Sequence, residues 1–162
     1  MVTSEFGAVV ADLDYPMTVV TCCLEGQPSG CLVGFASQCS IHPPRVSVWI
    51  SQANHTHDIA LRCSHLGVHW LSAADRPLAE LFGAVTGDDA DKFHRCRWRP
   101  AAGGVPVLED CGRWFVGRVL EKRFDGDHTG FLLEPVEDHA ADRWPGQLGY
   151  QAVKDLEPGH DP

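Results

Sequence analysis

Runs of apolar and β-branched residues, separated by short clusters of glycine, proline and polar residues, recur along the chain. Residues 17–24 (MTVVTCCL) are rich in β-branched side chains, which favour a strand. The glycine and proline of residues 25–28 predict a turn, and residues 29–36 are expected to form the return strand of a hairpin. Gly30 and Gly34 weaken that return strand, and a glycine there often marks a bulge or a close approach of the backbone to a ligand.

Later segments repeat this strand-like pattern, with short helical segments between them. The turn signal Asp125-Gly126-Asp127 predicts a hairpin between the last two long strands. One helix is expected to follow an N-cap at Asn54 or Thr56. Many strands with few short helices predict a mainly β fold, an antiparallel barrel decorated by helices. The expected strands are 45–50, 67–71, 113–122, 129–136 and 149–153, and the expected helices are 5–13, 54–63 and 77–82.

Length, composition and charge limit the class of protein. The 162 residues suffice for one domain with a core, and the 44% hydrophobic and 22% charged residues are typical of a globular chain. A formal net charge of −9 argues against a nucleic-acid partner, because phosphates bind clusters of Lys and Arg. No apolar run approaches the roughly 20 residues of a membrane span, and Glu5 stands where a signal peptide carries basic residues. We therefore expect a cytoplasmic protein without a membrane partner.

The chain contains 7 cysteines. Their odd number and the absence of a C-x-x-C pair disfavour a disulfide framework. Because cysteine also behaves as a small buried hydrophobe, we interpret them as reduced structural thiols. A zinc site built from His55, His57 and His128 has no supporting spacing of carboxylates or cysteines, so no metal is expected.

Three stretches could carry chemistry, namely residues 30–44, 54–56 and 126–128. In the first stretch, a strand that contains glycines is followed by small and polar residues. A flat aromatic ring could lie against such a strand, with backbone N–H and C=O groups pairing with the polar edge of the ring. The Ser40 hydroxyl and the polar groups of residues 54–56 would suit a phosphate. The alternatives are an edge strand with a turn and, for His128, a solvated or turn-capping histidine. No G-x-G-x-x-G, Walker, G-x-S-x-G or H-E-x-x-H motif occurs, which disfavours a Rossmann domain.

The order of several short motifs resembles that of the flavin-reductase-like, FMN-binding split-barrel family. The resemblance extends roughly from Phe6 to Val136, and it lies in the succession of the pieces rather than in any one of them. In chain order they are Val20-Thr21, residues 30–44, Asn54-His55-Thr56, Asp91-Lys92-Phe93, residues 104–108 and Gly126-Asp127-His128.

The resemblance implies a mainly β split barrel with a few short helices, formed as a single domain over 1–162 with a core at about 6–136 and a C-terminal tail at 137–162. It implies an NAD(P)H-dependent flavin reductase that binds FMN or FAD, uses NADH or NADPH as reductant and supplies reduced flavin to a partner monooxygenase. The open side of a split barrel leads us to expect a homodimer. Two alternatives are a module that only holds flavin, and an oxidoreductase that uses bound flavin or F420 directly on an organic substrate.

The resemblance also assigns site residues. Leu32, Gly34 and Phe35 replace the family's T-x-S-S side chains, so ring contacts there would come from the backbone, and His42 replaces an aspartate before Pro-Pro. The resemblance implies that His128 lies near the nicotinamide or its phosphate, as the catalytic residue. The implied cofactor-binding residues are Leu32, Val33, Gly34, Phe35, Gln38, Cys39, Ser40, Asn54, His55, Thr56 and Phe93.

Overall fold

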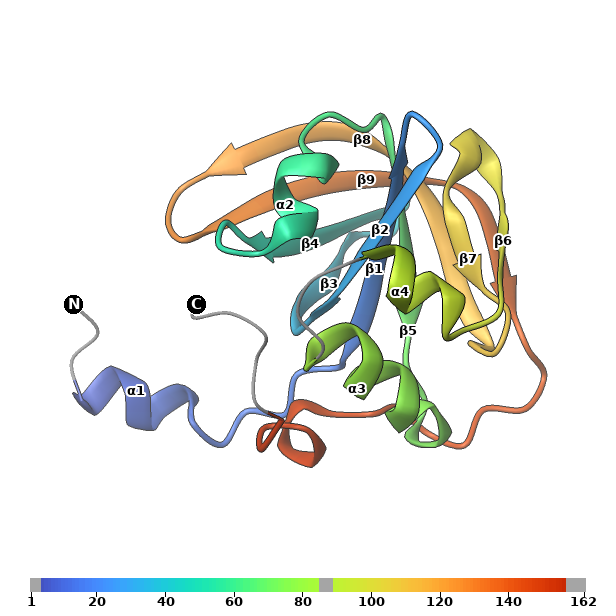
Figure 1. Cartoon of the computed structure of the whole chain (residues 1–162). Helices are drawn as coiled ribbons and strands as arrows, with labels where there is room; N and C mark the ends of the chain where they lie inside the picture. Colours follow the sequence, from blue (N-terminus) through green and yellow to red (C-terminus); the bar gives the residue numbers. More distant parts are fainter. Residues whose placement is uncertain (1–3, 85–88, 157–162) are drawn as a thin grey trace.

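One curled antiparallel sheet forms the body of the molecule (Figure 1). The computed structural model describes residues 4–84 and 89–156. Its sheet has 7 strands in the order β2-β1-β5-β8-β9-β4-β3. The predicted mainly β split barrel is thereby confirmed. The strands are β1 (Thr18–Leu24), β2 (Gln27–Val33), β3 (Phe35–Ser40), β4 (Arg45–Ser51), β5 (His65–Trp70), β8 (Arg113–Phe124) and β9 (His128–Ala140).

Two hairpins form where the turn residues predicted them. Leu24 pairs with Gln27 across the first, and its two central residues, Glu25 and Gly26, have φ of 52° and 78°. Positive φ at both positions matches the twist of the flanking strands, and Gly26 takes it without steric cost. The second hairpin joins β8 to β9 through residues 125–127.

The expected return strand 29–36 is wrong as a single element. Chain pairing changes at Gly34: Val33 pairs with Thr18 of β1, whereas Phe35 pairs with Trp49 of β4. The Thr18 hydroxyl donates to the Val33 carbonyl at 3.0 Å and fixes the last residue of β2. β2 and β3 are therefore the two opposite edges of the sheet, joined by one residue. This connection bends the sheet into an incomplete barrel.

Short helices and a small ribbon surround the sheet. The expected strand 149–153 is also wrong: the chain makes a 3-10 turn, η3 (Tyr150–Ala152), because sheet-like pairing there stops at the single bridge between Gly149 and Pro16. No helix in the described ranges is long and apolar enough to cross a bilayer. The other elements are α1 (Ser4–Val10), α2 (His55–Ala60), α3 (Arg76–Gly83), α4 (Asp89–His94), β6 (Trp98–Pro100), β7 (Pro106–Leu108), η1 (Ala73–Asp75) and η2 (Ala102–Gly104).

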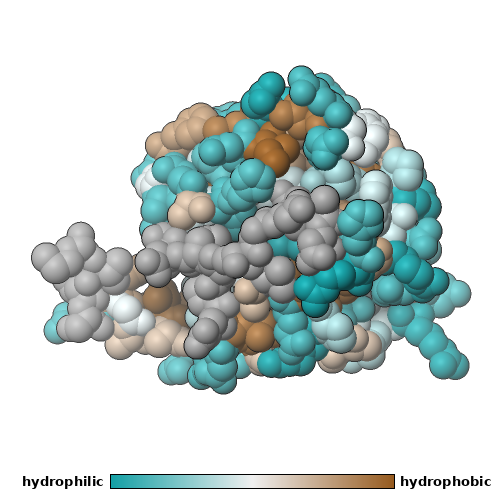
Figure 2. All heavy atoms as spheres, in the orientation of Figure 1, coloured by the Kyte–Doolittle hydropathy of each residue, from teal (hydrophilic) through white to brown (hydrophobic). Residues whose placement is uncertain are grey.

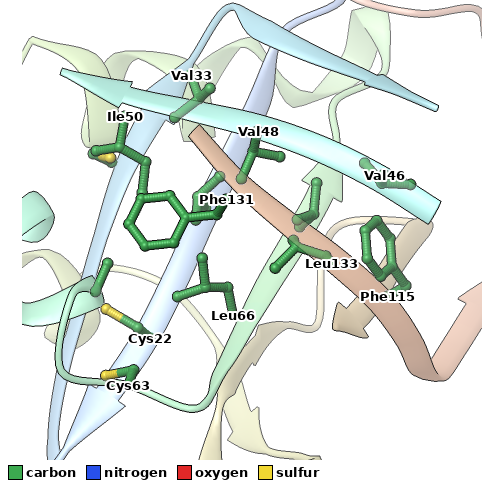
Figure 3. Close-up of a cluster of buried hydrophobic side chains, with 14 residues drawn as sticks. Cys22, Val33, Val46, Val48, Ile50, Cys63, Leu66, Phe115, Phe131 and Leu133 are labelled. Carbon is green, nitrogen blue, oxygen red and sulfur yellow. The ribbon is translucent and has the colours of Figure 1, made fainter. Parts of the chain in front are cut away.

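The main core fills the inside of the curled sheet (Figure 3). Strand β4 shows which side chains enter this core, because buried and half-buried residues alternate along the strand. Val46, Val48 and Ile50 are buried in the core, and Trp49 and Ser51 are only half-buried on the other face. Successive side chains of a strand point to opposite faces, so β4 separates the core from the surface that Trp49 and Ser51 line.

His69 is fully buried and ties three strands together. Its Nδ1 donates to the Val19 carbonyl of β1 at 3.0 Å, and its Nε2 accepts from the Leu108 amide of β7 at 2.9 Å. Both bonds require the neutral ring with its proton on Nδ1. Burial lowers the pKa of His69 to about 4, against the opposing effect of the Val19 carbonyl.

Acid should destabilise the fold through His69. Between its ordinary pKa of 6.5 and the folded value of about 4, the unfolded chain binds a proton that the folded chain does not. The free energy of unfolding should therefore fall by about 3 kcal/mol as the pH drops through this range, and His69 adds no pH dependence above it. Urea unfolding at several pH values measures the fall.

A flatter profile is expected for His69→Gln, whereas His94→Gln, at an exposed position, serves as the matched control. An unchanged profile in His69→Gln would show that other groups cause the acid sensitivity.

Candidate functional site

A cavity of about 690 Å³ opens where the two edges of the sheet diverge. That volume lies in the range of small-molecule sites. The walls come from the β2–β3 junction, the end of β4, the start of β9, the end of α3, the segment around α1 and the C-terminal segment. Figure 2 shows hydrophobic side chains gathered at the lower left of the molecule, where α1 meets the body. The lining residues are Val10, Ala11, Tyr15, Met17, Cys31, Leu32, Val33, Gly34, Phe35, Trp49, Ser51, Asn54, Phe82, Gly83, His128, Tyr150, Val153, Lys154 and Leu156.

The β2–β3 junction contributes Leu32, Val33, Gly34 and Phe35 to the wall, four of the residues predicted to bind a cofactor. Each edge strand has one sheet neighbour, so backbone N–H and C=O groups on its outer side are not used by the sheet. A Cβ on Gly34 would stand 3.6 Å from the sulfur of Met17, which also lines the cavity. The missing side chain therefore keeps space beside the backbone open.

Aromatic rings form a row along the cavity. The centroid of Phe35 lies 5.1 Å from that of His128 and 5.3 Å from that of Tyr15, which in turn lies 6.0 Å from Tyr150. Phe35 remains 45% exposed. The row gives the cavity flat apolar surfaces that a planar ligand can contact.

Trp49 adds a further ring, and a glycine on the neighbouring strand makes room for it. A Cβ on Gly130 of β9 would lie 2.7 Å from the indole, too close for any side chain. The indole therefore packs on bare backbone, and it also lines the cavity.

His128 opens β9, opposite Ser51 of β4, and lines the cavity. Its Nδ1 lies 2.7 Å from Oδ1 of Asp127, and the imidazole side chain is 24% exposed. The hydrogen bond from His128 lowers the pKa of the Asp127 carboxyl. A carboxylate at Nδ1 favours a proton there, so Nε2 is the ring nitrogen available to a ligand.

Polar groups line the cavity from two directions. Asn54 caps α2, its Oδ1 accepting from the Thr56 amide at 2.9 Å. Lys154 belongs to the C-terminal segment. Hydrogen bonds of Gln151 connect this segment to residues 11–14, which follow α1. The Gln151 amide donates to Asp14 at 2.8 Å, and its Nε2 donates to the carbonyls of Ala11 and Leu13 at 3.0 Å each.

Six of the predicted cofactor-binding residues lie outside this cavity lining. Thr56 is fully buried, with its hydroxyl 2.9 Å from that of Ser29. Phe93 packs between Phe82 and Trp98, with ring centroids 5.5 Å from each. Ser40 lies at the far end of β3, beside a register shift. The other three are Gln38 and Cys39 on β3 and His55 at the start of α2.

Sequence reasoning missed several lining residues. Trp49 had a usable signal, because alternation along 45–51 puts an aromatic ring on the face opposite Val46, Val48 and Ile50. Tyr150 and Lys154 had none, since only the pairing of residues distant in sequence brings their segment to the cavity.

Comparison with known proteins gives consistent matches. Residues 10–154 match the model of the flavin reductase like domain. An FMN reductase (NADH) RutF of Bradyrhizobium diazoefficiens is 33% identical over 100 residues, which are 60% of this chain and 55% of that protein. The reductase component of a 4-nitrophenol 4-monooxygenase/4-nitrocatechol 2-monooxygenase of Rhodococcus opacus is 29% identical, over 85% of this chain and 72% of its own.

Among solved structures, the NADH:FAD oxidoreductase SgcE6 of Streptomyces globisporus C-1027, in complex with NAD and FAD fragments, superposes with a TM-score of 0.74. It is 25% identical, over 87% of this chain and 82% of that chain. The family resemblance drawn from the order of the motifs is confirmed by the match over 10–154. The chain belongs to the flavin reductase like domain family.

Proposed function

We propose that this chain is an NAD(P)H-dependent flavin reductase that holds FMN or FAD in the cavity at the β2–β3 junction. The observation that carries the proposal is the combination, in one cavity of about 690 Å³, of unused strand edges, flat aromatic surfaces and His128. The FMN reductase and NADH:FAD oxidoreductase among its relatives support the same activity.

The residues present fit a flavin. The gap at Gly34 leaves the backbone of the β2–β3 junction accessible, and its amides and carbonyls suit the polar edge of an isoalloxazine. Phe35 and Trp49 offer apolar surface to the faces of the ring. Lys154 also lines this cavity, and its positive charge suits a phosphate.

Bound flavin would supply the redox chemistry, accepting a hydride from the reduced pyridine nucleotide and passing electrons onward. The protein's contribution is position and exclusion of water. The aromatic row and the apolar residues Met17 and Leu32 give the cavity an apolar lining that disfavours water, and the Asp127 carboxylate bonds Nδ1 of the His128 ring. This bond leaves Nε2 of His128 as the ring nitrogen that a ligand can use.

We assign the flavin phosphate to Lys154 and Asn54, because both line the cavity. A hydrogen bond to a charged group is worth about 1.5–3 kcal/mol, roughly a tenfold to hundredfold change in affinity. Lys154→Met should therefore weaken FMN by at least about tenfold and leave riboflavin, which lacks the phosphate, nearly unchanged. Quenching of flavin fluorescence during titration of the apoprotein measures both affinities.

Ser40→Ala is the matched comparison, since sequence reasoning predicted that Ser40 holds the phosphate. Selective loss of FMN binding in that variant alone would move the phosphate to the far end of β3. Failure of the unmodified chain to bind FMN or FAD at tens of micromolar would contradict the proposed function itself.

A homodimer is part of the proposal. The edge strands β2 and β3 each have one sheet neighbour. Exposed apolar side chains lie on α1 (Phe6 and Val9) and at the two ends of β3 (Phe35 and, directly after the strand, Ile41). On α1, Val9 is 70% exposed, and Figure 1 shows this helix extending away from the body of its own chain. A second copy that covers these surfaces would remove both the open edges and the exposed apolar area.

Light scattering at micromolar concentration should give about twice the mass of one chain. Val9→Glu should shift the population toward the single chain, because it places a charge in the covered surface. Leu120→Glu, at a position 38% exposed on β8, is the control and should leave the mass unchanged. A single chain that binds flavin would contradict the dimer.

We also propose that a flavin-dependent monooxygenase receives the reduced flavin. The Rhodococcus opacus relative is the reductase component of a 4-nitrophenol monooxygenase, which supports this partner class.

One observation favours the second candidate, a module that holds flavin without turnover. Phe35 replaces a small polar family residue, and its ring lies 5.1 Å from His128, in the space where a nicotinamide would approach that histidine.

NADH or NADPH oxidation by the unmodified chain with added FMN separates the two candidates, because a module that only holds flavin shows no turnover. His128→Ala then tests the role of His128. If His128 orients the pyridine nucleotide, the variant should raise the KM for NAD(P)H or lower kcat/KM by about tenfold or more, with flavin affinity nearly unchanged. Stopped-flow or steady-state NADH oxidation and flavin titration on the same variant test this. Unchanged kinetics would mean that His128 serves only the turn. A parallel loss of flavin binding would mean that His128 contacts the flavin itself.

A further inference from the structure

Two core cysteines lie side by side although they are far apart in sequence. Cys22 belongs to β1 and Cys63 to the short connection between α2 and β5. Figure 3 shows their sulfur atoms next to one another at the edge of the core. The Cys22 thiol is within hydrogen-bonding reach of the Cys63 sulfur. None of the cysteines is in a disulfide in this structure.

The surroundings of Cys63 favour its thiolate. The hydrogen bond from Cys22, a backbone hydrogen bond with Cys23 and the positive charges of Lys122 and Arg62 together lower the pKa of Cys63 to about 7, against the opposing effect of burial. Cys96 has no such neighbours that lower its pKa among the described residues, and burial raises the pKa of its thiol to about 11. Reaction with peroxide requires the thiolate, so Cys63 is the sulfur expected to react first.

The two cysteines also differ in solvent exposure. Cys63 is 8% exposed and Cys22 is not exposed at all. Cys63 is therefore the one of the two that solvent contacts, and we expect a small oxidant to reach it first.

We propose that Cys22 and Cys63 form a reversible disulfide when hydrogen peroxide oxidises the reduced protein. The Cys63 thiolate attacks one peroxide oxygen, the O–O bond breaks, and the departing hydroxide takes a proton to become water. The Cys22 sulfur then attacks the Cys63 sulfenic acid and loses its proton, and the sulfenic hydroxyl leaves as a second water. Two thiols and one peroxide thus give one disulfide and two waters.

The oxidant has a source near this protein. Reduced flavin that meets dioxygen yields hydrogen peroxide, so a flavin reductase would produce the oxidant in its own vicinity. The reaction of the thiols does not itself depend on the proposed function, because added peroxide replaces that source.

The disulfide would fasten β1 to the segment that follows α2. Asn54, at the other end of α2, lines the cavity, so the bridge restrains the element that carries one cavity residue. The sulfurs already adjoin in the core, which keeps the required movement small.

The test uses the full chain, reduced, freed of reductant and treated with stoichiometric hydrogen peroxide. Intact mass should fall by two hydrogen atoms, and fragmentation between Cys22 and Cys23 should place the bridge at Cys22 and Cys63. The bridge closes a long loop, so the Tm should rise by about 5–10 °C and return when dithiothreitol is added. Cys23→Ala and Cys96→Ala should retain these changes, and Cys22→Ala and Cys63→Ala should lose them.

Several outcomes would overturn the proposal. They are an unchanged mass, a bridge between Cys22 and Cys23 or between Cys23 and Cys63, and a Cys63 sulfenic acid trapped by dimedone in the unmodified chain without further conversion. Because the mass and fragmentation data come from the unmodified chain, they decide the matter even if a core variant fails to fold.

Discussion

The passage of the chain from one edge of the sheet to the opposite edge across Gly34 is the constraint on which the site depends. Val33 is held by β1 and Phe35 by β4, so neighbouring residues belong to strands at opposite ends of the sheet order. The sheet must curl to satisfy both pairings, and it cannot close, because the two edges share only this point. The cavity is the space that remains between them.

Local sequence predicted the elements that local interactions determine. The two hairpins, the long strands β8 and β9 and the N-cap at Asn54 all follow from turn residues, β-branched runs and a capping side chain close in sequence. The two glycines indicated a weak point, but local sequence still predicted one strand over residues 29–36, so the change of partner at Gly34 could not be predicted in this way. What interrupts the strand is competition between two distant partners, Thr18 and Trp49.

The same distinction applies to the candidate site. Leu32 to Phe35, Asn54 and His128 were predicted and line one cavity, whereas Thr56 and Phe93 lie in the packed interior. A short motif indicates which residue types occur near a site, but the direction of a side chain depends on the face its strand or helix turns to the core. The order of motifs identified the family, and packing decides which members of each motif face the cavity.

Gln151 joins two parts of the chain that are 137 to 140 residues apart, through three hydrogen bonds to residues 11–14. These bonds are exposed, and none of them belongs to the strand ladder of the barrel. The same segment is also held by the Gly149–Pro16 bridge and by the buried side chain of Val153. Because these attachments lie outside the strand ladder, opening the cavity wall that carries Tyr150 and Lys154 costs less than unfolding the sheet. Amide protons in this segment should exchange with solvent long before those of β1 or β9, and each such opening uncovers the cavity while the barrel stays folded.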